Sequence, residues 1–450
     1  MDDRNIPWTA DEELDGAKHV WPEGVEPDID RVLPIVPEGR RAVPAVFDAS
    51  GASASVVPLT PAEEAALAGA DPVLVSALEQ VELPKVSDLH IAVGAAPTFR
   101  VDGALQQAEV PAWDDVRVRA ALMSILTPEQ LERFEDELEL DFSFAVSPER
   151  RFRVNYSFQR GSLAGAFRII PAEIKGLDEL GVPKQVARFA GLPRGLVLVT
   201  GPTGSGKSTT LAALIDLVNR TRADHIVTVE DPIEFLHTHK RSIVHQREVG
   251  PDTHSFATAL KYVLRQDPDV ILIGELRDLE TISAALTAAE TGHLVFATLH
   301  TQDAPQTIDR IIDVFPPHAQ GQIRQQLAAT LQGIVCQTLV RRATGQGRTI
   351  AAEVLIMTPA IANLIREGKT YQVTSAMQAG RELGMQTLDQ SLAHLVDHGV
   401  ITKRSALEKA HDPDAFEHLV RRGGDVDKSN ARALGEIDFG DSFSAQMGRR

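Results

Sequence analysis

The segment Gly-Pro-Thr-Gly-Ser-Gly-Lys-Ser at residues 201–208 constrains the fold of this chain more than any other stretch. It lies between an apolar run at 196–199 and a helix-forming run at 211–215. Glycines at both ends let the backbone curl closely around a phosphate, so that its N–H groups and the N-terminus of the following helix point at the anion. A strand, this loop and a helix in that order predict a nucleotide-binding α/β fold.

The residues of this loop have distinct expected roles in binding ATP and Mg²⁺. Lys207 is expected to reach the β- and γ-phosphates, and the Ser208 hydroxyl is expected to be a ligand of the Mg²⁺ that bridges them. The residues of the loop predicted to bind the nucleotide are Gly201, Thr203, Gly204, Ser205, Gly206, Lys207, Ser208 and Thr209.

Composition limits the class of protein around this loop. With 450 residues, of which 43% are hydrophobic, the chain has material for two or three buried cores. It has no apolar run near the roughly 18 residues that cross a bilayer, and its acidic start lacks the features of a signal peptide, so we expect a soluble, cytoplasmic protein. The single cysteine, Cys336, excludes an intrachain disulfide and a zinc site built on several cysteines.

The formal net charge of −18 bears on the partners of the chain. A chain this acidic is not expected to bind nucleic acid or anionic lipid widely and without sequence preference. We therefore expect no nucleic-acid partner, and contact with a membrane only through another protein.

Residues 1–71 form an acidic, proline-rich extension. Eight prolines occur among residues 1–70, and residues 1–80 hold 16 Asp and Glu against 5 Lys and Arg. Low hydrophobicity and excess charge predict disorder, because such a segment buries too little surface to offset its ordering entropy. The extension is either a solvated tail or a docking segment for a partner.

Residues 72–175 show the pattern of a compact α+β domain. Helices are expected at 73–78 and 114–139, and Asp102-Gly103 is a turn signal. Strands are expected at 87–93, 99–103, 141–146, 152–158 and 164–169. Their alternating apolar residues predict an antiparallel sheet that is covered on one face.

Three arginines of this domain have two open interpretations. Arg153, Arg160 and Arg168 either form the exposed face of the sheet or meet a nucleotide on the neighbouring core or subunit. In the second position an arginine stabilises the charge of the transition state.

Residues 193–375, which follow a linker at 176–192, repeat buried strands separated by helical stretches. The strands are continuous apolar runs at 196–199, 226–229, 270–273 and 294–298. Runs without alternation fit strands buried on both faces, and helical crossovers between them give a parallel sheet. Helices at 376–412 and a mostly disordered tail at 413–450 are expected to follow.

Polar side chains follow three of these strands, at the edge where open α/β sheets place their sites. Glu275 is expected to orient the Mg²⁺ shell or to hold and polarise the attacking water. Glu230 begins an acidic stretch, 230–234, that suits metal and water positioning. His300 is expected to sense the γ-phosphate or a neighbouring subunit, with a neutral imidazole near pH 7. Further candidates are Arg277 and Asp278, as interface or sensor residues, and His293.

Four stretches resemble, in order and spacing, the Walker A, Asp box, Walker B and His box of the secretion ATPases. They are 201–210, 229–235, 269–278 and 291–301. Within that superfamily the chain is most similar to the PilT-like retraction ATPases of type IV pili. The similarity runs from Ser87-Asp88-Leu89-His90 to Met385-Gln386-Thr387-Leu388-Asp389, through most of the chain.

The resemblance implies a homohexameric ring in which a PAS-like N-terminal domain joins a RecA-like core with a parallel-rich sheet, followed by a helical C-terminal part. It implies that Glu230 and Glu275 serve catalysis, that His300 belongs to the sensing shell, and that Arg153 and Arg168 act on the nucleotide. The implied partners are an inner-membrane platform protein and other pilus ATPases, at the inner face of the cell membrane.

Two features depart from the family pattern. The family's retraction signature, Ala-Ile-Arg-Asn-Leu-Ile-Arg-Glu, occurs at 360–367 with Ala362 in place of its first arginine. The extension and the tail after Asp412 lie outside the common family body, as docking segments or as tolerated disorder.

The leading functional hypothesis is a motor ATPase whose ring withdraws pilin subunits by moving its domains against one another. A pilus-assembly or export ATPase is the close alternative, although the four-cysteine zinc module common in such enzymes cannot form with one cysteine. A DNA-handling RecA-like ATPase would need a basic groove with aromatic residues. A regulatory subunit without turnover is opposed by the intact Lys207, Ser208, Glu230 and Glu275.

Overall fold

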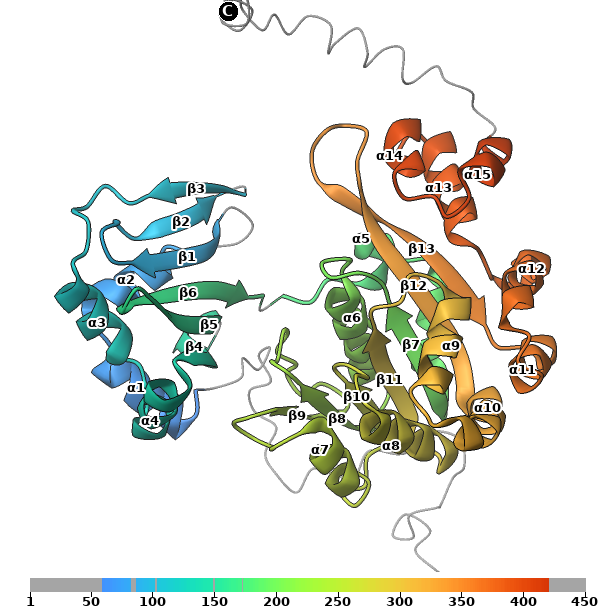
Figure 1. The fold of residues 1–450 in the computed structure, drawn as a ribbon, viewed down its shortest axis with the longest axis horizontal. Helices are drawn as coiled ribbons and strands as arrows, with labels where there is room; N and C mark the ends of the chain where they lie inside the picture. Colours follow the sequence, from blue (N-terminus) through green and yellow to red (C-terminus); the bar gives the residue numbers. More distant parts are fainter. Residues whose placement is uncertain (1–58, 82–85, 102, 149, 172, 421–450) are drawn as a thin grey trace, which may run out of the picture. The chain divides into compact units, whose positions relative to one another are not determined.

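The computed structural model describes residues 59–81, 86–101, 103–148, 150–171 and 173–420 (Figure 1). Their strands form two sheets, one of six strands and one of seven. Within these residues, no helix combines the length and the apolar character needed to span a membrane. The predictions for residues 1–58 and 421–450 lie outside the described residues.

The six-stranded sheet is antiparallel throughout, with the order β3-β2-β1-β6-β5-β4, which confirms the predicted antiparallel sheet. Its strands are β1 Val86–Ala92, β2 Thr98–Val101, β3 Ala104–Gln107, β4 Glu139–Ser147, β5 Arg150–Gln159 and β6 Ser162–Ile170. Strand β3 was not predicted. The chain enters it after Gly103, whose φ of +87° suits a glycine.

Four helices pack with this sheet around an apolar core that includes Phe134, Phe152 and Tyr156. They are α1 Pro61–Gly69, α2 Pro72–Glu79, α3 Asp115–Met123 and α4 Pro128–Glu137. The predicted helical stretch at 114–139 is therefore two helices. The chain restarts at Thr127, whose side chain caps α4 in a capping box, and Pro128 takes the first helical position.

Helix α1 corrects the prediction of disorder for its part of the extension. Thr60 and Glu63 form a reciprocal capping box, and proline again occupies the first turn. Glu63 also pairs with Arg151 of β5. These contacts order residues whose composition alone indicated a solvated segment.

The seven-stranded sheet has the order β13-β12-β7-β11-β10-β8-β9. Its strands are β7 Gly195–Thr200, β8 His225–Glu230, β9 Ile243–Glu248, β10 Val270–Ile273, β11 Leu294–Leu299, β12 Leu331–Arg341 and β13 Arg348–Ile356. All pairs are parallel except β12 with β13. The four predicted apolar strands lie side by side in it, as expected for a parallel sheet, and β9, β12 and β13 were not predicted.

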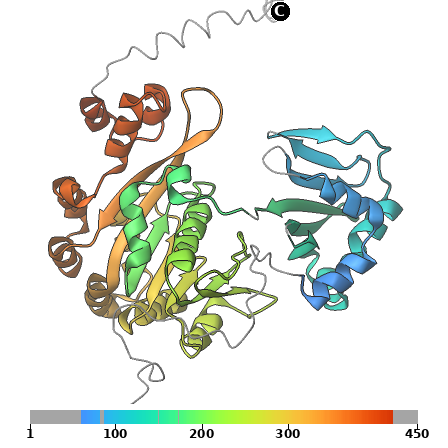
Figure 2. The same ribbon diagram turned by 180° about the vertical axis from the view of Figure 1, so that it is seen from behind.

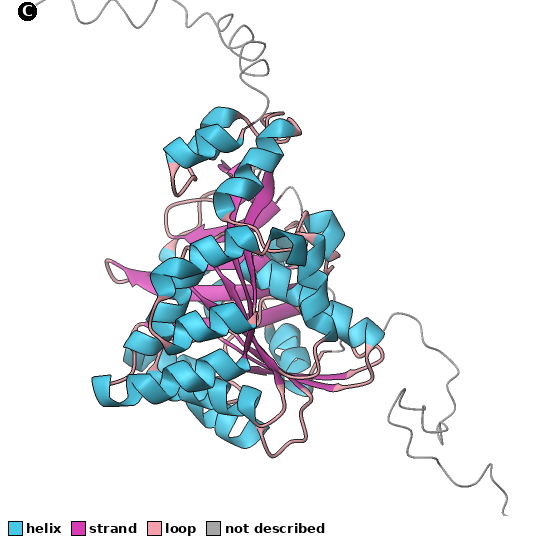
Figure 3. Cartoon of the chain, turned by 90° about the vertical axis from the view of Figure 1, so that its right-hand side faces the viewer, coloured by secondary structure: helices cyan, strands magenta, loops and turns pink. Residues whose placement is uncertain are grey.

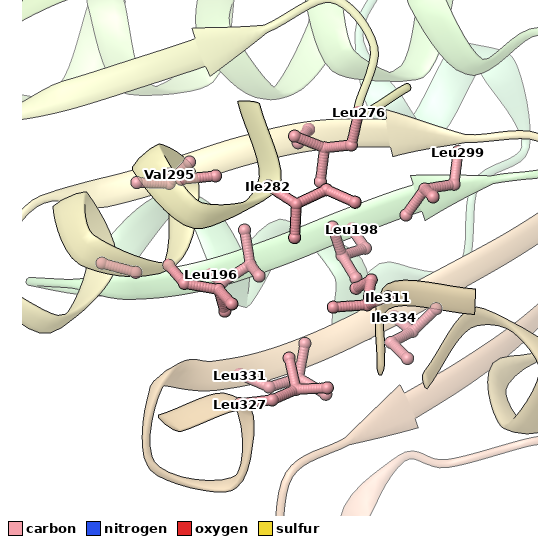
Figure 4. Close-up of a cluster of buried hydrophobic side chains, with 14 of the residues drawn as sticks. Leu196, Leu198, Leu276, Ile282, Val295, Leu299, Ile311, Leu327, Leu331 and Ile334 are labelled. Carbon is pink, nitrogen blue, oxygen red and sulfur yellow. The ribbon is translucent and has the colours of Figure 1, made fainter. Parts of the chain in front are cut away.

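Helices cover both faces of this sheet (Figure 1 and, from behind, Figure 2), and Figure 3 shows its strands between them. They are α6 Lys207–Thr221, α7 Phe256–Val263, α8 Leu279–Glu290, α9 Ala304–Asp313 and α10 Pro317–Thr330. Alternate residues of β7 face opposite layers: Leu196 and Leu198 pack with α7 to α10, as Figure 4 shows for part of that cluster, and Val197 and Val199 pack with α6.

The segment 176–192, predicted as a linker, is folded onto the core. It forms α5 Leu177–Leu180 and a 3₁₀ helix, η1, at Lys184–Gly191. Phe189 of η1 is buried against β12, where Gly333 leaves room for it: a Cβ on Gly333 would lie 2.2 Å from Phe189 Cζ.

The C-terminal helices form two groups. They are α11 Pro359–Arg366, α12 Val373–Ala379, α13 Leu388–Asp397, α14 Lys403–Leu407 and α15 Pro413–Leu419, with short 3₁₀ turns at Thr370–Gln372 and Arg381–Leu383. Helix α11 buries Ala362 against the core, and α13 to α15 pack on the β12–β13 hairpin. Helix α15 lies at the start of the segment that was predicted to be a mostly disordered tail. It corrects that prediction for its own residues, because Phe416 is fully buried among these helices.

Candidate active site

The predicted phosphate loop joins the carboxyl end of β7 to the first residue of α6, Lys207. Three of its glycines have positive φ: Gly201 at +139°, Gly204 at +75° and Gly206 at +89°. A Cβ on Gly201 would lie 2.2 Å from the carbonyl oxygen of Gln337. The loop therefore depends on glycine for both its backbone conformation and its close approach to β12.

A cavity of about 470 Å³ opens at the carboxyl ends of the parallel strands. The predicted residues that line it are Thr203, Gly204, Gly206, Lys207, Ser208, Thr209, Glu230, Glu275 and His300. Gly201 and Ser205 belong to the same loop, but both are buried and neither lines the cavity. The strands end at the same edge of the sheet, which is why residues far apart in the sequence share one cavity.

The ammonium group of Lys207 is held by the loop itself. Its Nζ donates to the carbonyl oxygens of Gly201, at 3.0 Å, and Pro202, at 3.3 Å. Burial lowers the pKa of Lys207, while the charges of Glu275 and Glu234 act in the opposite direction. A buried cation between carboxylates and loop N–H groups is suited to a bound polyphosphate.

Glu275 is positioned by two neighbouring side chains. Arg277 Nη2 lies 2.8 Å from its Oε2, and His300 Nε2 lies 3.2 Å from its Oε1. Burial acts to raise the pKa of Glu275, but Arg277 and His300 outweigh it, so the pKa is lowered. Glu275 therefore stays ionised, which is the form in which a carboxylate can bind a metal ion.

Glu230 is in a different environment. Burial raises its pKa to about 7, against hydrogen bonds from Thr228 and Gln246 that favour the ionised form. A carboxyl group that titrates near neutral pH is suited to accept a proton during turnover. Two carboxylates at equivalent strand ends thus differ in chemistry because their surroundings differ.

Two other candidates, Asp278 and His293, do not line the cavity and make contacts that stabilise local structure. Asp278 caps helix α8 by accepting from the backbone N–H and the hydroxyl of Thr281, both at 2.8 Å. His293 precedes β11, at the end of the strand opposite to His300, and its Nδ1 lies 3.0 Å from the carbonyl oxygen of Ala288. Arg277, by contrast, lines the cavity beside Glu275.

The three arginines lie in the six-stranded sheet. Arg153 of β5 and Arg168 of β6 are directly opposite one another, and both side chains are exposed. Arg168 Nε lies 2.7 Å from Asp88 Oδ1. Arg160 occupies the β5–β6 turn with a φ of +52°. An exposed sheet face agrees with the first interpretation of Arg153 and Arg168, and their action on a nucleotide stays a prediction.

Sequence reasoning missed two glutamines at this site. Gln337 of β12 is 2% exposed, and its Nε2 donates to the carbonyl oxygen of Ser205 at 2.8 Å. Gln246 of β9 donates to Glu230. A glutamine inside the apolar run at 334–340 was the available signal for Gln337, because a buried amide needs partners.

The oxygen donors of the cavity fit Mg²⁺. Ser208 and Glu275 both line it, and hydroxyl and carboxylate oxygens are the ligands that Mg²⁺ accepts. Among the described residues, no group of three or more His, Cys, Asp or Glu side chains could hold a metal ion. This donor set suits Mg²⁺, which usually takes one or two protein ligands together with substrate phosphates and water.

The chain is similar to known proteins over most of its length. The family model described as Type II/IV secretion system protein matches residues 69–408. The chain is 51% identical, over 330 residues, to the type IV pilus retraction ATPase PilT of Pseudomonas aeruginosa, covering 73% of this chain and 96% of that protein. It is 48% identical, over 321 residues, to a twitching motility protein of Neisseria gonorrhoeae, covering 71% of this chain and 86% of that protein. A crystal structure of the pilus retraction motor PilT with bound ADP matches with a TM-score of 0.72 and 48% identity, over 77% of this chain and 99% of that one.

Proposed function

This chain belongs to the type II/IV secretion system protein family and, within it, to the PilT-like retraction ATPases, and we propose that it hydrolyses ATP to withdraw type IV pilus fibres in twitching motility. The observation that carries this function is the cavity where Lys207, Glu230 and Glu275 converge at the carboxyl edge of the sheet. The similarity to a retraction motor extends over nearly that motor's whole length.

Hydrolysis requires water to attack the γ-phosphorus while the bond from that phosphorus to the β–γ bridging oxygen breaks. ADP and phosphate leave, and the proton released by the water passes to Glu230, whose pKa of about 7 suits a general base. Lys207 and the loop N–H groups stabilise the charge on the phosphate oxygens. Glu275, kept ionised by Arg277 and His300, orients the reacting groups.

Ser208 and Glu275 are the residues that would hold Mg²⁺. When bound, the ion neutralises charge on the β- and γ-phosphates. The protein supplies the hydroxyl, the carboxylate and the walls of the cavity around them.

The assembly we propose is a cytoplasmic homohexamer that acts on an inner-membrane platform protein, with other pilus ATPases as further partners. Arg153 and Arg168 are proposed to act on the nucleotide from the exposed face of their sheet. An export ATPase is the second candidate, since a type II secretion protein of Pseudomonas aeruginosa is 33% identical over 372 residues. The higher identity to PilT favours retraction.

The test counts surface pili on cells that lack the gene and on cells that carry the Lys207→Ala allele. Lys261→Ala, at an exposed position of α7, is the matched control. Retraction predicts an excess of pili in the deletion and in Lys207→Ala, and normal counts in the control. Bald cells would show that the motor assembles fibres instead. ATPase activity that DNA stimulates would point to a DNA-handling enzyme and would overturn the proposal.

A further inference from the structure

Gln246 lies on the edge strand β9, next to Glu230, the candidate general base. Strands β8 and β9 pair in parallel, with Gln246 opposite Thr228 and Glu248 opposite Glu230. The carboxamide of Gln246 makes three hydrogen bonds. Its Nε2 donates to Glu230 Oε1 at 3.1 Å and to the carbonyl oxygen of Phe235 at 2.8 Å, and its Oε1 accepts from the backbone N–H of His237 at 2.7 Å.

These partners determine which way the amide points. The His237 N–H can only donate, so it must face the amide oxygen, and the two oxygen partners must face the amide nitrogen. Of the side chains of this shape, only glutamine satisfies all three groups, because glutamate lacks the two N–H donors and methionine lacks both donor and carbonyl.

A second donor reaches the same carboxylate oxygen. Thr228 is fully buried, and its hydroxyl lies 2.7 Å from Glu230 Oε1. The carboxylate of Glu230 is therefore held by a threonine on its own strand and by a glutamine from the neighbouring strand. Two converging donors restrict its rotation, which is what a proton acceptor in a fixed position requires.

The hydrogen bonds of Gln246 to Phe235 and His237 connect it to the wall of the cavity. Both belong to the loop 231–237, and both line the nucleotide cavity together with Glu230. Gln246 itself does not line that cavity within the described residues. From a position outside the cavity, its amide therefore connects the Glu230 carboxylate to the loop 231–237, which forms one wall of the cavity.

We propose that Gln246 is a positioning residue of the ATPase site, which holds the Glu230 carboxylate in place and couples it to the loop 231–237. The inference rests on the proposed function, because it assigns a partner to the group that accepts the proton. Gln246 acts through Glu230 and does not touch the substrate.

Charge around Glu230 makes this role measurable by pH. The charged or titratable groups that share the cavity with Glu230 are Asp231, Glu234 and His237 on its own loop, Lys207 on α6, Glu275 and Arg277 after β10, His300 after β11 and Arg348 on β13, and Glu248 is its pairing partner on β9. Burial raises the pKa of Glu230 to about 7, and the hydrogen bonds from Thr228 and Gln246 act against that rise. Loss of the Gln246 donor must therefore move this pKa further up.

The experiment measures kcat and KM for ATP from pH 6 to pH 10 in the full chain and in Gln246→Met. Since Glu230 must be ionised to accept a proton, activity is lost as the pH falls through its pKa. A lost hydrogen bond to a charged group should shift the acid limb of kcat upward by about one pH unit. That shift gives a roughly fivefold loss of kcat at pH 7, recovery near pH 9, and KM within about twofold of the unchanged chain.

Two further variants and one control sharpen the test. Thr228→Val removes the other donor at nearly constant volume and should shift the limb in the same direction. Gln246→Glu keeps the side-chain shape if the methionine variant does not fold, and the added carboxylate should shift the limb at least as far. Gln326→Met is the matched control, because Gln326 Nε2 donates at 2.7 Å to Glu290 on an exposed surface outside the site. Its profile should match that of the unchanged chain.

The positioning role would be overturned by either of two results for Gln246→Met or Gln246→Glu. Its profile of kcat against pH would superimpose on that of the unchanged chain, or its kcat would be lower by the same factor at every pH. Failure of the proposed function itself would look different. The unchanged chain would then lack ATPase activity, or Glu230→Gln would retain full turnover.

Discussion

Replacing Gly201 with alanine should damage the phosphate loop more than any other single methyl group added there. The new Cβ would lie 2.2 Å from the carbonyl oxygen of Gln337 and 2.7 Å from Ser205 Oγ, and the φ of +139° is strained for any residue with a side chain. Overpacking costs about 1–3 kcal/mol and backbone strain costs about 1–3 kcal/mol, so we expect a loss of about 4 kcal/mol in the free energy of unfolding. In a domain of this size that loss lowers Tm by roughly 8–16 °C.

The loop can relieve the clash only by moving about 1 Å away from β12, since ordinary carbon contacts need about 3.5 Å. A displacement of that size at a reacting group costs on the order of 10²-fold in rate. Thermal unfolding, binding of a fluorescent ATP analogue and kcat together measure both effects. Gly321→Ala is the matched control in α10, where an added Cβ meets nothing within 4 Å, and it should be neutral or slightly stabilising. If Gly201→Ala keeps the original Tm and ATP affinity, the geometric reasoning is refuted.

Two further predictions concern acid–base behaviour and metal binding. Glu353 is 3% exposed, and burial raises its pKa from 4.5 to about 7. As the pH rises from 4.5 to 7, Glu353 loses its proton in the unfolded chain before it does so in the folded chain. The free energy of unfolding should therefore fall by about 3 kcal/mol between these two pH values and should stay at the lower value above pH 7. Glu353→Gln should remove this loss, as denaturant unfolding of both chains at several pH values would show; a constant difference between the two chains would contradict it. Ser208→Ala should raise the Mg²⁺ concentration for half-maximal ATPase activity at least about tenfold, the smallest effect usual for an outer-shell partner, and an unchanged Mg²⁺ titration would exclude Ser208 as a ligand.

Much of the core could be predicted from short stretches of sequence. The phosphate loop needs only a strand, three glycines, a lysine and a helix in succession, and all of these are adjacent in the chain. The four apolar runs were recognisable because strands buried on both faces have no alternation. Parallel strands share one carboxyl edge, so Glu230, Glu275 and His300 could be expected together before their distances were known.

Local composition was misleading where a short segment gains its order from distant partners. Helix α1 lies in an acidic stretch, but Glu63 pairs with Arg151, 88 residues away in the chain. Helix α15 lies in a polar tail, but Phe416 is buried against α13 and the β12–β13 hairpin. An average over many residues does not report such contacts, because each depends on one side chain and its partner.

The sequence by itself determined the class of this protein and the chemistry of its loop, because those depend on residue types at fixed spacings along one chain. Only the tertiary structure decided which groups modify that chemistry. Gln337 reaches Ser205 from 132 residues away, and Gln246 holds Glu230 from a neighbouring strand. Glu230 and Glu275 lie at the carboxyl ends of neighbouring strands, yet burial raises the pKa of Glu230 and ion pairing lowers the pKa of Glu275. Burial and pairing are properties of the folded surroundings, and the residues that create them are not neighbours in the sequence.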